Sequence, residues 1–219
     1  MIRQIALLLL SSLALDANQA VAIDSAQGHG ASILKSATEE DRLSHDRRLT
    51  EEQRNDHKTK YHQALRAAYS ALLSESNAGN ADSMWRLGAA SGVFQREGFT
   101  TRHEGTVWLR KAASLGHEEA PFELALQLLE IGDADGKIEG FRWLKKSTQI
   151  GCRRWQAAVE LARYYTYGFP EIKLKRSASA AWAWIDKGAE LMGCSKGEFM
   201  AENGLADPRT IKKSQILFE

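Results

Sequence analysis

The stretch WLRKAASLG at residues 108–116 decides the fold, because it recurs along the chain. Residues 143–151 read WLKKSTQIG, with the same Trp, Leu and Lys and the same closing glycine. Residues 184–193 read WIDKGAELMG, in which the closing glycine comes one residue later. The tryptophans of the three stretches lie 35 and then 41 residues apart. Self-similarity at such a period is typical of a repeat protein.

Each of these stretches is predicted to be a helix that ends at its glycine. Trp108, Ala112 and Leu115 follow the i, i+4, i+7 spacing, so we expect them to form one apolar face of the first helix. The position of Gly116 suits the left-handed turn that ends many helices, which predicts a positive φ there. Lys111, together with its counterparts in the other two stretches, is expected on the surface of the repeats.

A second helical pattern alternates with the tryptophan helices. Its small residues Gly88, Ala125 and Ala162 occupy equivalent positions, where close approach of two helices requires a small side chain. Each unit is therefore predicted to contain a first helix (helix A), a loop, a tryptophan helix (helix B) and a glycine turn.

This arrangement resembles the Sel1-like repeats, which are related to the tetratricopeptide solenoids. The resemblance covers residues 80–194. It is most specific in helix B, at Trp108, Lys111, Ala112, Ala113 and Gly116; only the third helix A keeps the family's tyrosine and glycine, as Tyr165 and Gly168. It implies an all-α fold, a right-handed α-solenoid of three helix-turn-helix repeats.

The ends of the chain have patterns of their own. Arg3, an apolar run too short to span a bilayer and the small residues Ala20 and Ala22 predict a cleaved signal peptide, and hence a periplasmic or secreted protein without a membrane anchor. Thr50 and Gln53 are spaced as a capping box at the start of a long helix. The predicted domains are a signal peptide (1–22), a flexible lead-in (23–48), an N-terminal capping helix or half-repeat (49–79), three repeats (80–194) and a C-terminal cap (195–219).

Composition and motifs leave no support for an enzyme. The 219 residues are 43% hydrophobic and 26% charged with a net charge of +1, which gives no overall case for nucleic-acid binding. Ser32 and Lys35 match the Ser-x-x-Lys of penicillin-recognising enzymes, but the Lys-Thr-Gly motif that should accompany it is absent. With no metal-binding or nucleotide-binding motif either, we expect no catalysis, no cofactor and no metal site.

The two cysteines allow a disulfide without requiring it. Cys152 and Cys194 each follow a repeat-closing glycine, and an exported chain with an even number of cysteines favours a bridge. Equivalent positions in adjacent helix pairs are, however, about 10 Å apart, roughly one helix diameter. A disulfide needs Cα atoms within about 7 Å. A Cys152–Cys194 bridge and two free thiols both remain open.

Function is therefore expected to reside in the surface that the repeats build. The first hypothesis is an exported adaptor, monomeric, that binds a protein partner through its concave face; the resemblance implies scaffold and regulator roles. The alternative is an immunity protein that neutralises a secreted antibacterial toxin such as a lipase. Trp155 and Trp182 lie outside the repeat pattern and suit an interface. The candidate partner-binding residues are Arg86, Glu123, Gln127, Trp155, Arg163 and Trp182.

A basic cluster surrounds the turn at Gly151, formed by Arg142, Lys145, Lys146, Arg153 and Arg154. It has two interpretations, a surface that docks a charged partner or a solvated outer face.

Overall fold

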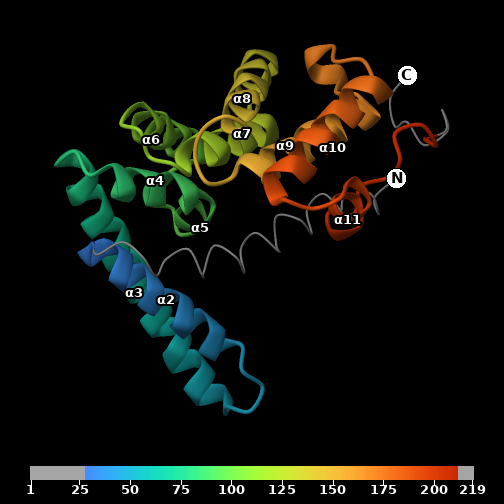
Figure 1. Cartoon of the computed structure of the whole chain (residues 1–219). Coiled ribbons are helices and arrows are strands. Elements are labelled where there is room, and N and C mark those ends of the chain that lie inside the picture. Colours follow the sequence, from blue (N-terminus) through green and yellow to red (C-terminus); the bar gives the residue numbers. More distant parts are fainter. Residues whose placement is uncertain (1–27, 212–219) are drawn as a thin grey trace. The chain divides into compact units, whose positions relative to one another are not determined.

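The computed structural model describes residues 28–211, and within that range all regular secondary structure is helical, apart from one isolated β-bridge between Phe169 and Leu174 (Figure 1). The predicted all-α class is confirmed. The helices pack in neighbouring pairs, which is compatible with a helical solenoid. The chain divides into two compact units, the first ending at Thr101 and the second starting at Arg102. This division falls inside the first predicted repeat, so each unit is described by itself.

The first unit contains a helical hairpin. Helix α2 (His29–Ser44) runs antiparallel to the long helix α3 (Glu51–Asn77) (Figure 1). Gly30, at the start of α2, lies so close to α3 that an added Cβ atom would come within 2.8 Å of the Leu72 side chain. The backbone N–H of Gly30 also donates to Glu75 Oε1 over 2.9 Å.

The interpretation of residues 23–48 as a flexible lead-in is wrong for His29–Ser44. Ala31, Leu34 and Ala37 are spaced three residues apart and are buried on one side of α2. Two of these three are only alanines, and Ser32, Lys35 and Ser36 lie between the three, so the pattern is weak in the sequence and the helix becomes recognisable only when α3 covers it.

Helix α3 begins as predicted. The Thr50 side chain accepts from the Gln53 backbone N–H, and the Gln53 side chain accepts from the Thr50 N–H, which completes the capping box. The unit continues with α4 (Ala81–Ala89) and α5 (Ser91–Arg96).

The second unit contains the three tryptophan helices, each where the sequence places it. They are α6 (Arg102–Ser114), α8 (Ala134–Ser147) and α10 (Ala178–Met192). The A-type helices α7 (Ala120–Ile131) and α9 (Arg154–Tyr167) alternate with them. A 3-10 turn at Pro170–Ile172 and helix α11 (Lys196–Glu202) complete the described part. Helices α6 and α7, α7 and α8, α9 and α10, and α10 and α11 pack as neighbours.

The buried face of the tryptophan helices differs from the predicted one. Ala112 is fully buried, but Trp108 is only half-buried and Leu115 is 57% exposed. The residue after each tryptophan forms the core instead, because Leu109, Leu144 and Ile185 are all nearly inaccessible. Trp143 and Trp184, the counterparts of Trp108, are likewise only partly buried. The helices are rotated relative to the expected orientation, which brings small residues against the neighbouring A helix.

Close helix packing in this unit depends on those small residues. An added Cβ atom at Gly140 in α8 would come within 3.0 Å of the Ala125 carbonyl oxygen in α7. Ala125 and its counterpart Ala162 in α9 are completely buried, as the recurrence of small residues predicts.

The predicted glycine turns are confirmed by backbone angles. Gly116, Gly151 and Gly193 have φ values of 86°, 81° and 70°, a region that side chains other than glycine rarely adopt. Gly151 additionally touches the loop before α7, because an added Cβ atom would lie 2.1 Å from the Glu118 carbonyl oxygen.

At the C-terminal side, Phe199 of α11 is fully buried against Gly188 of α10, consistent with a cap on the last pair of helices. The predicted signal peptide (1–22) and the last eight residues lie outside the described range.

Candidate functional site

The predicted partner-binding residues do not all belong to one place. Arg86 lies in the first unit, whereas the other five residues lie in the second. Arg86 is only 3% exposed, and its Nε atom donates to Asp82 Oδ2 over 2.7 Å. Its guanidinium also lies over the Trp85 ring, 5.2 Å from the centroid. These contacts make Arg86 part of the packing of α4, and it is not available as a docking residue.

Arg86 nevertheless marks a register position that the second unit repeats. Glu123 in α7 and Glu160 in α9 follow it at intervals of 37 residues, each immediately before the buried leucine of its helix. Glu123 was among the residues predicted from the sequence and Glu160 was not, although the 37-residue spacing points to both. We call the polar stripe around these two carboxylates the A-helix face; its residues are Glu119, Glu123, Gln127, Gln156, Glu160 and Arg163.

Glu123 has a strongly perturbed carboxyl on this face. It is 4% exposed, and burial raises the pKa of its carboxyl to about 7, against a usual value of 4.5. The Arg153 guanidinium opposes this shift and Glu119 adds to it. Arg153 in turn pairs with Glu119, with 3.0 Å between Nη2 and Oε2, and this pair joins the starts of α7 and α9.

Glu160 has a similar environment one helix further along. Burial raises the pKa of its carboxyl, although the Arg163 guanidinium lies beside it. Arg163 Nη1 donates to Glu160 Oε1 over 2.7 Å, and Nη2 donates to the Asn203 carbonyl oxygen over 3.0 Å. Arg163 thus links the A-helix face to the end of α11.

Gln156 lies one helical turn before Glu160 on the same side of α9. Its Oε1 atom is buried and has no hydrogen-bond partner among the described residues. A buried acceptor without a donor typically costs about 1–3 kcal/mol. Gln156 lies beside the two carboxylates on the A-helix face.

The two tryptophans chosen from sequence flank this face without joining it. Trp155 and Trp182 are both half-buried against the cluster of Val159, Ala162 and Ile185. The Trp182 ring also lies under the Arg209 guanidinium, 4.9 Å from its centroid. Gln127 lies half-buried on α7, in the next turn after Glu123.

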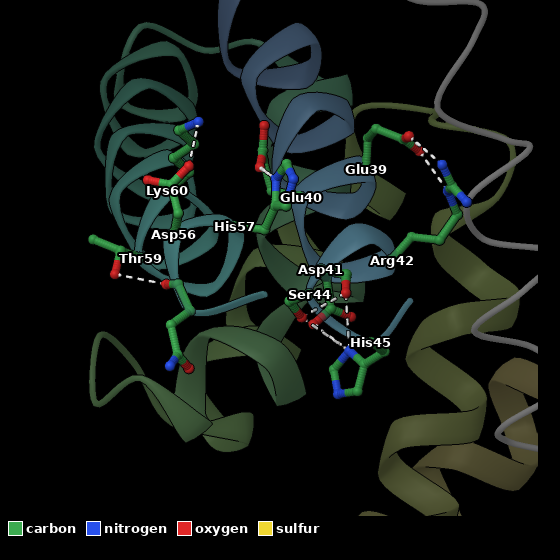
Figure 2. Close-up of polar contacts among 11 residues, drawn as sticks. Glu39, Glu40, Asp41, Arg42, Ser44, His45, Asp56, His57, Thr59 and Lys60 are labelled. Carbon is green, nitrogen blue, oxygen red and sulfur yellow. Dashed lines mark hydrogen bonds and ion pairs between the residues drawn. The ribbon is translucent and has the colours of Figure 1, made fainter. Parts of the chain in front are cut away.

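The helical hairpin of the first unit has several polar contacts along α2 and α3. His57 Nδ1 and Glu40 Oε2 lie 2.7 Å apart and connect α3 to α2, while the Asp56–Lys60 and Glu39–Arg42 contacts stay within one helix (Figure 2). Ser32 and Lys35 lie on exposed positions of α2. In the described range, no three His, Cys, Asp or Glu side chains are grouped to hold a metal ion.

Cys152 and Cys194 are both free in this structure. Cys152 is exposed and Cys194 is half-buried. Burial, followed by the charge of Glu119, raises the pKa of the Cys152 thiol, which lowers its reactivity as a nucleophile. Among the described helices, none has the length and apolar character needed to cross a membrane.

Comparisons with known proteins add no assignment: no family model, no curated protein and no solved structure matches this chain.

Proposed function

We propose that this chain is an exported helical-repeat protein of the Sel1-like kind, which binds another protein through its A-helix face and performs no catalysis. The recurring tryptophan helices and their glycine turns support the family, and the signal-like pattern of residues 1–22 supports export. Stacked helix pairs commonly hold their partners along the surface that one set of helices lines.

The observation that carries the proposal is the buried Oε1 atom of Gln156. The Gln156 side chain is half-buried and its Oε1 atom has no donor, so a shift of that side chain on binding would let a partner's N–H group supply the hydrogen bond. Glu123 and Glu160 add two carboxylates on the same face, and burial raises the pKa of each. A polar strand or helix of another protein offers donors at the spacing of such a face.

The test is a quantitative pull-down with the exported protein as bait and the envelope and secreted fractions as prey, read by mass spectrometry. Gln156→Arg places a bulky cation on the A-helix face. Gln149→Arg makes the same change at an exposed position beyond the end of α8, and is the matched control. Circular dichroism establishes that both variants remain folded.

We expect a protein captured at near-stoichiometric level by the wild type and by Gln149→Arg, and reduced about tenfold or more by Gln156→Arg. If the captured protein is a single secreted toxin, the function is that of a toxin inhibitor. Equal capture by both variants, or no captured protein, would contradict the proposal.

A further inference from the structure

A second surface of the second unit has features that its own packing does not explain. Leu115 is 57% exposed and Ile150 is 41% exposed, and each lies seven residues after its repeat tryptophan. Their backbones are equivalent as well. The Leu115 N–H donates to the Lys111 carbonyl oxygen, and the Ile150 N–H donates to that of Lys146. One exposed aliphatic side chain is ordinary, but the same exposure at the same position of two successive repeats is a pattern.

The lysines at these positions also occupy equivalent places. Lys111 Nζ lies 4.2 Å from the centroid of the Trp108 ring, and Lys146 Nζ lies 4.5 Å from that of Trp143. Each tryptophan is half-buried, while each lysine is exposed. Helix periodicity places each tryptophan and its lysine on one side of the helix, and the aliphatic residue follows in the turn after the helix ends. We name this surface the B-helix stripe; it consists of Trp108, Lys111, Leu115, Trp143, Lys146 and Ile150.

A rigid contact links the two halves of the stripe. Arg110 on α6 forms a bidentate pair with Glu139 on α8, with Nε–Oε1 and Nη2–Oε2 distances of 2.9 and 2.7 Å. The Trp143 Nε1 atom donates to the same carboxylate over 3.2 Å. This arrangement links a side chain of α6 to one of α8, and both helices also pack against α7.

Basic side chains predominate around the stripe, where the Glu139 carboxylate beside Trp143 is a nearby acidic group. Residues 109–115 and 141–150 contain five basic side chains and no acidic one. Arg110 is paired with Glu139, whereas Lys111 and Lys146 each contact a tryptophan ring. Basic side chains near helix C-termini complement the helix dipole, which accounts for some of this charge. The dipole gives no reason for the exposed Leu115 and Ile150.

We propose that the B-helix stripe is a docking surface for an acidic, amphipathic segment of another protein. Carboxylates of that segment pair with Lys111 and Lys146, and its apolar side chains cover Leu115, Ile150 and the free edges of the two tryptophans. Apolar contacts supply the area that is removed from water, and complementary charge sets the register. This surface is independent of the A-helix face, so either proposal can fail without the other.

The test uses the purified chain and a fluorescent helical peptide of about 14 residues, or four turns, with Glu and Leu on one face. A peptide with Lys in place of Glu is the control for charge sign. Binding is measured by fluorescence anisotropy at low and at physiological salt, since pairing with exposed charges weakens as salt increases. Vesicles containing phosphatidylserine are tested in parallel.

Two double variants examine the two parts of the stripe. Lys111→Glu/Lys146→Glu reverses the cations, and Leu115→Ser/Ile150→Ser removes the exposed aliphatic groups. The matched control for charge, Lys58→Glu/Lys175→Glu, makes the same change in net charge at exposed positions elsewhere. Far-ultraviolet circular dichroism checks that all three remain helical.

We expect the acidic peptide to bind, the lysine peptide to fail, and each stripe variant to weaken binding by about tenfold or more, equivalent to roughly 1.4 kcal/mol. The control variant is expected to stay within about twofold of the wild type. Three results would overturn the proposal: no binding of the acidic peptide, equal losses in the control and stripe variants, or binding to the vesicles alone.

Discussion

At the scale of single residues, Gly116 and Gly151 share a backbone conformation but have different neighbours. Both close a tryptophan helix with a positive φ, as the sequence pattern predicts. Their surroundings differ. No heavy atom lies within 4 Å of a Cβ atom added at Gly116, whereas one added at Gly151 meets the Glu118 carbonyl oxygen at 2.1 Å. Only Gly151 is required both by its conformation and by its neighbour.

We therefore predict that Gly151→Ala destabilises the protein more than Gly116→Ala. Gly116→Ala should cost about 1–2 kcal/mol, the usual penalty for a left-handed conformation in a residue with a Cβ atom. Gly151→Ala should cost roughly 1–3 kcal/mol more, because the backbone must move to remove the overlap between the new Cβ atom and the Glu118 carbonyl oxygen. Urea denaturation of both variants measures the difference, and equal losses would refute the close approach at Gly151.

The raised pKa of the Glu123 carboxyl predicts how the stability of the fold depends on pH. Because burial raises the pKa of its carboxyl to about 7 in the folded state, the folded chain binds a proton that the unfolded chain has released above about pH 4.5. Stability associated with Glu123 is therefore present at low pH and is lost as pH rises towards 7. Glu123→Gln should flatten this slope and raise the stability above pH 7 by up to about 3 kcal/mol.

The measurement is the free energy of unfolding between pH 4 and pH 8. This is about the interval over which the Glu123 carboxyl binds different numbers of protons in the folded and unfolded states. Glu118→Gln makes the same chemical change at an exposed neighbour and should leave the slope as in the wild type. A Glu123→Gln profile parallel to that of the wild type would contradict the buried carboxyl.

At the scale of elements, helix B was predicted correctly in place but not in rotation. The start, the end and the closing glycine of each tryptophan helix follow from residues close in the chain. Which side faces the core depends on the neighbour. Leu109 and Leu144 are inaccessible because α7 covers that side, and Leu115 is exposed because the described part of the chain places no helix over it.

The contact between α10 and α11 provides a test at this scale. An added Cβ atom at Gly188 would come within 2.1 Å of Phe199 Cζ, so Gly188→Ala should displace α11 and cost roughly 1–3 kcal/mol. Gly197→Ala, within α11 but with open space around it, should instead stabilise the helix by up to about 1 kcal/mol. Hydrogen exchange of the α11 amides separates the two outcomes, and unchanged protection in Gly188→Ala would disprove the packing.

At the scale of the whole molecule, the repeat period and the compact units do not coincide. The sequence assigns α4 and α6 to one repeat, but the units divide between Thr101 and Arg102. The second unit contains its own clusters, one around Leu144 and Leu161 and one around Ile185 and Phe199. Neither cluster contains a residue of the first unit.

We predict that residues 102–219 fold when expressed alone, with a helical circular dichroism spectrum and a cooperative thermal transition. Residues 102–192, which lack α11, should be less stable by about 3–5 kcal/mol, the usual cost of removing a buried phenylalanine. A second unit that is unfolded by itself would show that the first unit is needed for its stability.

The sequence by itself determined the features that depend on near neighbours: the helical class, the positions of the tryptophan helices, the Thr50 capping box and the positive φ of Gly116. These follow from contacts between residues a few positions apart, which a local pattern records. Tertiary structure alone decided that residues 29–44 form a helix, that Leu109 and not Trp108 is the core residue, and that Glu123 and Glu160 are desolvated. Each of these depends on burial by a segment distant in the chain, and burial is a property of the packed helices that no single stretch contains.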